Sequence, residues 1–239
     1  MQVTTKAIVL TSIKYGDTSL IVKAFTESDG LKSYLLRGVL ASKKGKLKTA
    51  YFQPLTQLEL TASHKNKGTL ETIKEVKVLN LYGTLHSNIV KNSLVMFLAE
   101  MLGNSIQEEQ QDAGLYNYIA YSLQWLDVNE DIANFHLLFL LNLTKFLGFY
   151  PDTSNLSFPY FDLLEGQFIF TPSLNPLLET ETINSFKTLL GINFDALKGI
   201  KIAKGNREAL LKSVILYFEL HLHGFRKPKS LAVLNAIFD

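Results

Sequence analysis

The densest run of chemically active side chains in the sequence is a group of lysines at residues 42–48. Lys43, Lys44, Lys46 and Lys48 are interleaved with Gly45. A glycine there lets the backbone approach a groove closely. Lysine is a point charge that suits phosphates, so the run predicts contact with a polyanion rather than a catalytic step.

Further cations and aromatic rings lie on the neighbouring predicted strands. The rings are Phe25, Tyr34, Tyr51 and Phe52. A charged groove that follows the phosphates, with rings on which bases stack, is what sequence-tolerant binding of single strands requires. The other interpretation is that the rings fill a core and the lysines keep a loop soluble. We favour the core for any one ring and a phosphate track for the lysines together. The predicted DNA-binding residues are Lys14, Lys23, Lys32, Tyr34, Arg37, Lys43, Lys44, Lys46 and Lys48.

The choice of cation argues against base-specific recognition. Only three arginines stand against twenty-one lysines, and the forked guanidinium is the group that reads guanine. The sequence has no zinc-finger spacing and no heptads that follow a basic region. We therefore expect DNA binding that ignores base sequence.

A second basic group lies around a predicted helix at residues 206–223. Lys204 and Arg207 stand in its first turn, where cations oppose the helix dipole, and this conflict indicates that they grip a carboxylate or phosphate. A surface cluster paired with nearby acids is an equally good explanation. The cations before and within the helix are Lys201, Lys204, Arg207 and Lys212, those after it are Arg226, Lys227 and Lys229, and the acids are Glu179, Glu181 and Glu208.

Patterns for catalysis and metal binding are missing from the sequence. The lack of cysteine excludes a disulfide frame, a thiolate metal site and a cysteine nucleophile. No phosphate-binding loop, nucleophile elbow or zinc-protease motif occurs. His221 and His223 are too close in sequence to share a metal on a helix, and His136 lies within an apolar helix, where we expect a core residue. We predict no enzyme activity, no cofactor and no metal.

The charges are segregated along the 239 residues, although the net charge is only +2. Residues 1–80 hold thirteen basic and six acidic side chains, residues 81–200 hold four and thirteen, and residues 201–239 hold seven and three. This pattern indicates that the first segment faces a polyanion. The sequence opens without an export signal, and the longest candidate membrane stretch, residues 132–150, has an unbroken apolar run only at residues 137–141, which is too short to cross a membrane. We expect a cytoplasmic protein with no membrane partner.

Five strands must position the first group of cations. Leu20, Val22 and Ala24 alternate with residues of the opposite face, and Pro54 marks an edge strand or a bulge. Five short antiparallel strands fit a small closed barrel, and the five-stranded barrel most used for nucleic acid is the OB-fold. The strands are predicted at residues 3–15, 19–26, 31–39, 49–63 and 69–79.

Helical periodicity replaces the strand pattern after Asn80. A short hairpin with several glycines and prolines interrupts the helices at residues 150–172. The predicted fold is α+β, with an OB-fold domain at residues 1–80 and a helical domain at residues 81–239 that carries the hairpin. The helices are predicted at residues 86–106, 112–127, 131–148, 174–190, 194–197 and 206–223, with a short last one after Pro228.

Motifs in the order and spacing of a known family run through the whole chain, which resembles the RecO recombination mediators of bacteria. Each motif alone is unspecific, and their order carries the resemblance. The motifs are Ala7-Ile8-Val9-Leu10, Tyr15-Gly16-Asp17, Ile21-Val22, Phe25-Thr26, Gly30, Arg37-Gly38, the lysine run from Ser42, Pro54-Leu55, Leu58-Glu59, Leu147-Gly148-Phe149, Pro151, Gly166, Arg207, Gly224-Phe225 and Lys229-Ser230-Leu231.

The resemblance implies an amino-terminal OB-fold on a helical domain. It implies binding of single- and double-stranded DNA, annealing of complementary strands, and cooperation with RecR to load RecA. It also implies that the helical domain binds the acidic, aromatic tail of single-strand binding protein, for which Lys204, Arg207 and Lys212 are the candidate residues.

The chain departs from the family at residues 150–172. Many members carry four cysteines there as a zinc site, and this chain has none. We expect packed aromatic rings to replace the metal: Phe158, Tyr160, Phe161, Phe168 and Phe170.

These observations predict a DNA repair and recombination mediator that binds DNA without sequence specificity and anneals strands. The alternative, of a different class, is a scaffold whose OB-fold binds protein or oligosaccharide. Oligomeric state and the preference between single and double strands stay open at this point.

Overall fold

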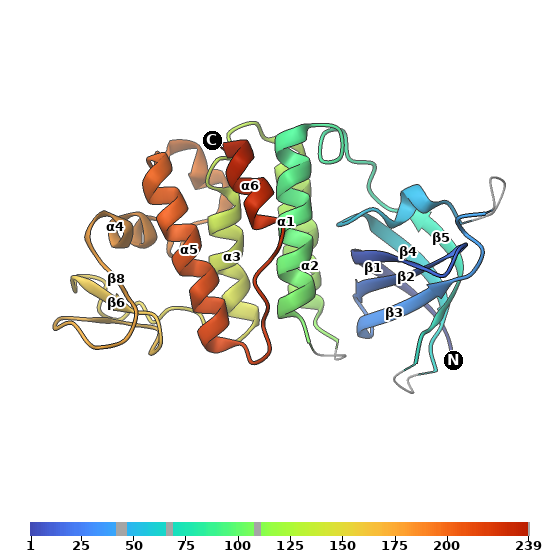
Figure 1. Cartoon of the computed structure of the whole chain (residues 1–239), viewed down its shortest axis with the longest axis horizontal. Helices are drawn as coiled ribbons and strands as arrows, with labels where there is room; N and C mark the ends of the chain where they lie inside the picture. Colours follow the sequence, from blue (N-terminus) through green and yellow to red (C-terminus); the bar gives the residue numbers. More distant parts are fainter. Residues whose placement is uncertain (42–46, 66–68, 108–110, 239) are drawn as a thin grey trace. The chain divides into compact units, whose positions relative to one another are not determined.

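The computed structural model describes residues 1–41, 47–65, 69–107 and 111–238. The chain divides into two compact units, Met1–Asp127 and Val128–Asp239. The first contains a five-stranded sheet and two helices, and the second contains helices and a small three-stranded sheet (Figure 1). This is the predicted α+β class. No helix of the described residues is both long and apolar enough to cross a membrane.

The five-stranded sheet of the first unit is antiparallel and has the strand order β3-β2-β1-β4-β5. The predicted strand count is confirmed, and the fold is OB-like. The strands are β1 (Gln2–Tyr15), β2 (Ser19–Thr26), β3 (Gly30–Leu36), β4 (Gln57–Ser63) and β5 (Thr72–Val78).

The alternation of side chains decides which face of this sheet becomes the core. In β2 the predicted apolar set of Leu20, Val22 and Ala24 is buried and joins the main cluster of the unit. Tyr34 and Leu36 of β3 belong to the same cluster. We call this the inner face, and its period of two is what a sheet with one filled face requires.

The expectation of a closed barrel is wrong, because the sheet is not closed. Among the described residues, its two edges meet at a single parallel bridge, between Tyr34 of β3 and Glu71, the residue before β5. The backbone of Glu71 accepts from Leu35 at 2.9 Å and donates to Ser33 at 2.8 Å. The ladder of β5 begins at Thr72 on the side of β4, so within the described residues only Glu71 connects the two edges.

The predicted fourth strand is shorter than expected. Residues Thr49–Phe52 form a 3-10 helix, η1, and the strand begins only at Gln57. Between them Pro54 has no N–H for a ladder, and Leu55 takes a left-handed φ of 58°. The sequence predicted an edge strand or a bulge at Pro54, and the structure has a turn there instead.

A carboxylate fixes the chain where it leaves the sheet and enters the helices α1 (Ile89–Ser105) and α2 (Ala113–Val128). Asp127 accepts from the backbone N–H of Gly83, Thr84 and Leu85 at 2.7–3.0 Å. Burial raises the pKa of Asp127, but these hydrogen bonds outweigh it and hold the pKa below its ordinary value.

The second unit packs four helices and a short 3-10 helix with a small sheet of order β7-β6-β8. The predicted hairpin is confirmed as β6 and β7, and β8 adds a strand that was not predicted. The elements are α3 (Phe135–Phe146), β6 (Tyr160–Asp162), β7 (Gln167–Ile169), β8 (Leu177–Leu178), α4 (Thr180–Leu189), η2 (Phe194–Gly199), α5 (Lys204–His221) and α6 (Leu231–Phe238).

Helix α5 holds the hairpin in place through two side chains of its last turns. Tyr217 donates its hydroxyl to the carbonyl of Phe149 at 2.8 Å, and Nε2 of His221 lies 2.9 Å from the carbonyl of Leu163. Gly166 allows this close approach, because a Cβ there would lie 2.8 Å from the Tyr217 hydroxyl. Its φ of 68° also favours glycine.

Candidate nucleic-acid interface and partner pocket

Three cations of the predicted DNA-binding set are exposed on the first unit. Lys14 lies near the end of β1, Arg37 directly follows β3, and Lys48 precedes η1. An exposed ammonium or guanidinium can reach a phosphate without first losing a protein partner, so these three are the described residues best placed for a polyanion.

Lys23 is half-buried on the opposite face of β2 from the core. Its ammonium donates to the carbonyl of Gly103 in α1 at 3.2 Å. Burial lowers the pKa of the Lys23 side chain. Its charge is thus partly engaged within the unit, where it connects the sheet to the end of α1.

Lys32 and Tyr34 lie on the inner face of β3. Lys32 is buried, and Tyr34 has no exposed surface. The hydroxyl of Tyr34 lies 2.8 Å from Nε2 of His64, and burial, with Asp29 and Glu71 adding to it, raises the pKa of Tyr34. A ring in this position cannot stack on a base, so we leave both residues out of the proposed surface.

The partners of Tyr34 form a buried polar network at the one bridge between β3 and β5. Nδ1 of His64 lies 3.3 Å from a carboxylate oxygen of Asp29. The amino group of Met1 donates to the His64 carbonyl at 2.7 Å, and Glu71 accepts from the N–H of Lys65. The hydrogen bonds to the His64 carbonyl, to its Nε2 and to Glu71 stabilise the edge of the sheet, while Nδ1 of His64 has the Asp29 carboxylate nearby but no hydrogen-bond partner among the described residues.

Lys43, Lys44 and Lys46 lie outside the described residues. Their contact with DNA stays a prediction from the sequence. Lys48, the last lysine of the same run, is the one whose position the structure describes.

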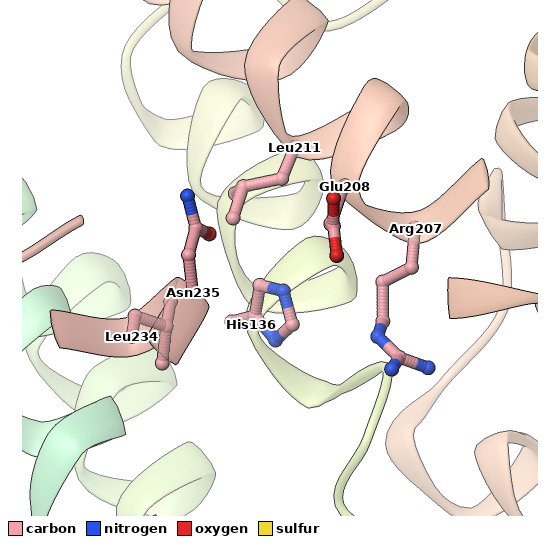
Figure 2. A pocket seen from close by; sticks show the side chains of 6 residues that line it. All are labelled: His136, Arg207, Glu208, Leu211, Leu234 and Asn235. Carbon is pink, nitrogen blue, oxygen red and sulfur yellow. The ribbon is translucent and has the colours of Figure 1, made fainter. Parts of the chain in front are cut away.

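A shallow pocket, with an enclosed volume of only about 10 Å³ and a mouth open to solvent, lies between α3, α5 and α6 of the second unit. Figure 2 shows His136 of α3 between side chains of α5 and side chains of α6. Arg207 is the cation among the lining residues and Glu208 the anion. The lining residues are His136, Arg207, Glu208, Leu211, Leu234 and Asn235.

His136 is buried, as the apolar pattern of its helix predicted. Burial, with the charge of Arg207 adding to it, lowers the pKa of His136 to about 3. The imidazole is therefore neutral at physiological pH and presents a polar but uncharged wall of the pocket. The positive charge of this pocket comes from Arg207 alone among its lining residues.

The structure separates the three residues predicted to hold a partner's tail. Arg207 lines the pocket, and its guanidinium also donates to the Ile202 carbonyl at 3.4 Å. Lys204, at the first residue of α5, and Lys212 are exposed and are not among the lining residues. They can add long-range attraction for an anion, whereas Arg207 can contact it.

Sequence reasoning missed the far wall of the pocket. Leu234 and Asn235 come from α6, and nothing local in the sequence brings them to His136. Glu208 was weighed only as a surface partner for the cations, yet it lines the pocket beside Arg207. Its carboxylate opposes the approach of an anion, and no sequence pattern signals that.

Aromatic rings pack where the zinc site of many RecO proteins is expected from the resemblance. Phe161 lies 4.9 Å from Phe168 and 4.7 Å from Phe186 of α4, measured between ring centroids. Phe158 and Phe170 form a second pair at 5.8 Å. Such pairs add stabilisation beyond the area that they bury.

A buried carboxylate that the sequence did not single out organises the same segment. Asp162 accepts from the backbone N–H of Leu164 and Glu165 and from the side chains of Ser173 and Asn175, at 2.7–3.1 Å. Burial raises the pKa of Asp162, but these hydrogen bonds outweigh it and the pKa lies below its ordinary value. The described residues contain no group of three or more metal-ligating side chains, so they do not fit a zinc ion.

Two family models together match nearly the whole chain. One, described as recombination protein O N terminal, matches residues 1–82, and the other, recombination protein O C terminal, matches residues 86–232.

Relatives of full length agree with these matches. A protein of Christiangramia forsetii named DNA repair protein RecO is 50% identical over 238 residues, which cover 100% of both chains. The protein of that name from Flavobacterium psychrophilum is 49% identical over 239 residues, again 100% of both. One from Bacteroides fragilis is 35% identical over 242 residues, 98% of both.

We expect His136 to make the protein less stable as the solution becomes acidic. Its pKa is about 6.5 when unfolded and about 3 when folded, so between these values the unfolded chain binds a proton that the folded chain excludes. Stability from this residue is complete above the upper value and falls as the pH drops below it. Urea unfolding between pH about 5 and about 7.5 should show a smaller fall in the free energy of unfolding for His136→Gln than for the wild type. His223→Gln, the control at an exposed histidine, should behave as the wild type.

We expect Asp162, and no metal, to stabilise the hairpin segment. Asp162→Ala removes the acceptor of four hydrogen bonds and should cost about 2–4 kcal/mol. Asp152→Ala, an exposed carboxylate of the same segment, should cost much less. A chelator should leave the thermal midpoint unchanged, and elemental analysis should find no stoichiometric zinc. A chelator-sensitive midpoint would show that residues outside this network bind a metal.

Proposed function

This chain belongs to the RecO family of DNA repair proteins, and we propose that within DNA repair and recombination it binds single- and double-stranded DNA without sequence specificity. We further propose that it anneals complementary strands and works with RecR to load a recombinase, without covalent chemistry of its own. Residues 1–80 are the proposed DNA-binding domain, and the cytoplasm is the proposed location.

The observation that carries this proposal is the placement of cations on the first unit. Lys14 of β1, Arg37 directly after β3 and Lys48 before η1 are exposed, while apolar side chains of the sheet fill the inner face. Cations that project from a small sheet suit a phosphate backbone, which carries one charge at every nucleotide. Contacts to phosphates carry no base information, so such binding tolerates any sequence.

Annealing follows from the same electrostatics. Two strands repel each other through their phosphates, and cations that neutralise part of this charge let the strands come close enough to pair. Since the base edges are not held by hydrogen bonds from the protein, they stay available for Watson–Crick pairing. The protein then promotes pairing without acting on any covalent bond.

The alternative function is a scaffold whose OB-like sheet binds a protein or an oligosaccharide. Neither ligand needs an array of cations, so its affinity would change little with salt. Membership of a DNA repair family favours the nucleic-acid proposal over this one.

For the second unit we propose that the pocket beside Arg207 takes the acidic tail of single-strand binding protein. The guanidinium would bind a carboxylate of the tail, while Leu211 and Leu234 would contact its apolar side chains. Lys204 and Lys212 would attract the tail from outside the pocket. Glu208 limits the affinity, because its charge repels the ligand.

We expect the affinity for single strands to fall steeply with salt, and Arg37→Ala to flatten that fall. Each lost phosphate contact should reduce the log–log slope by about 0.7. Fluorescence anisotropy with labelled oligonucleotides of unrelated sequence measures both the slope and the lack of base preference. Lys48→Ala should behave in the same way.

Lys77→Ala is the matched control, because Lys77 is an exposed lysine of the same sheet that lies directly across from an acid, Glu59, in the β4–β5 ladder. This variant should keep the slope of the wild type. A flat salt dependence in the wild type, or the absence of binding to any oligonucleotide, would favour the scaffold instead.

We expect opposite effects from two neighbouring substitutions in the pocket. Arg207→Glu removes the cation and adds a repulsive charge, which should weaken binding of a tail peptide by about 2 kcal/mol or more, roughly 30-fold. Glu208→Gln removes the like charge and should strengthen binding roughly 2- to 5-fold. Titration calorimetry with the peptide measures both.

Lys145→Glu is the control for charge reversal, because Lys145 is exposed near the other end of α3 from His136. It should bind the peptide like the wild type. Unchanged affinity in Arg207→Glu would remove this residue, and with it the pocket, from the tail site.

A further inference from the structure

The outer face of the β1–β2–β3 strands carries exposed apolar side chains that the core does not use. Ile13 is 62% exposed and Tyr15 is 56% exposed, although both lie in a regular strand. Single exposed apolar residues are common, but these two share one face of β1 because they are two residues apart. Their neighbours across the sheet decide whether they form a surface.

The register of the strands places apolar residues beside them. Ile13 lies opposite Ile21, and Ile21 lies opposite Leu35. Both neighbours are only half-buried. The three form one row across three strands, since directly paired residues on one face are in contact range. Tyr15, opposite Ser19, begins the next row toward the hairpin turn.

Helix α1 covers this face on one side and leaves the apolar row open. The end of α1 lies over the row of Thr11 and Lys23: the Lys23 ammonium donates to the carbonyl of Gly103, and a Cβ on Gly103 would lie 3.7 Å from the Thr11 methyl. Farther from the turn, Ile8 and Phe25 on the same face are fully buried. The exposed rows start where that cover ends.

Of the two exposed cations nearby, Arg37 lies beside the open rows and Lys14 points to the other face of the sheet. Lys14 is exposed between Ile13 and Tyr15, on the other side of β1. Arg37 is exposed directly after β3, and the chain that follows it stays next to the hairpin turn, with the N–H of Leu40 donating to the Thr18 carbonyl at 2.9 Å. The positions of the two rows, Ile13, Ile21, Leu35, Tyr15 and Ser19, include no acid, and Asp17 lies at the turn itself.

From this arrangement we infer that Tyr15 and the Ile13–Ile21–Leu35 row form a stacking platform for the unpaired bases of a single strand. The bases of the strand lie on the apolar side chains, with the Tyr15 ring against one of them, while its phosphates meet Arg37. The inference rests on the proposed DNA binding and deepens it, because it assigns a preference between single and double strands.

The physical reason for that preference is access to the base faces. In a duplex each base is stacked between its neighbours, so an apolar platform on the protein gains nothing from it. In a single strand the faces are open, and stacking on an aromatic ring stabilises binding whatever the base. The cations act on both forms of DNA, and the platform acts on one.

The test compares Tyr15→Ala with Tyr121→Ala, a tyrosine of α2 that is 54% exposed. Affinities are measured at one salt concentration for a single strand, a duplex, and a strand of the same length made of abasic sites. Tyr15→Ala should weaken single-strand binding about 10-fold, with little change for the duplex or the abasic strand and with the salt slope kept. Tyr15→Phe should retain the wild-type affinity, and Tyr121→Ala should match the wild type on all three ligands.

A spectroscopic readout supports the same assignment. Tyr15→Trp should show fluorescence quenching by the single strand that the abasic strand does not produce, after subtraction of the signal of Trp125 measured in the wild type. Quenching by both ligands alike would place the ring against the backbone and overturn the inference.

The remaining outcomes separate this inference from the proposed function. A wild type that binds no nucleic acid overturns both. A wild type that binds single strands normally while Tyr15→Ala binds them equally well overturns the platform alone. If Tyr15→Ala instead abolishes self-association in sedimentation experiments and leaves DNA binding intact, the face is a contact between copies of the chain.

Discussion

A lysine or arginine can bind DNA only where its charged end stays in water until the strand arrives, and the pleat of the five-stranded sheet decides which cations satisfy this. Successive side chains point to opposite faces, and one face of β2 and β3 is filled by the apolar core. Lys32 falls on that face and is buried, while Lys14 and Arg37 lie beyond the core and are exposed. The same constraint leaves Ile13 and Tyr15 in solvent.

Burial also decides which side chains are charged in the pocket of the second unit, but there it removes a charge. Burial keeps His136 neutral, so the pocket has a polar wall without a second cation. Arg207 supplies the charge and Glu208 offsets it. One cation beside one anion would give the proposed acidic ligand a weak and readily reversible site.

The sequence predicted what depends on local periodicity and missed what depends on distant contacts. The alternation of Leu20, Val22 and Ala24 identified the inner face correctly, and the apolar pattern around His136 identified a buried helix. Tyr34 was predicted among the DNA-binding residues but lies in the core, because the pairing of β3 with β2 sets it opposite Val22 on the inner face. Leu55 ended the expected fourth strand through a left-handed φ of 58°, which no pattern signals for a leucine. The wall of the pocket at Leu234 arises from tertiary packing alone.

The proposed stacking on Tyr15 and the proposed annealing of strands make opposite demands, and the size of the platform would reconcile them. A protein that covered many bases would prevent them from pairing, whereas one that held only phosphates would not favour the single strands on which pairing begins. One ring and one short apolar row engage few bases, and each stacked base adds only about 1–3 kcal/mol. The incoming strand gains a stacking and pairing energy of similar size at each step. On this proposal the complementary strand would displace the platform base by base, while the cations would continue to hold the phosphates of both strands.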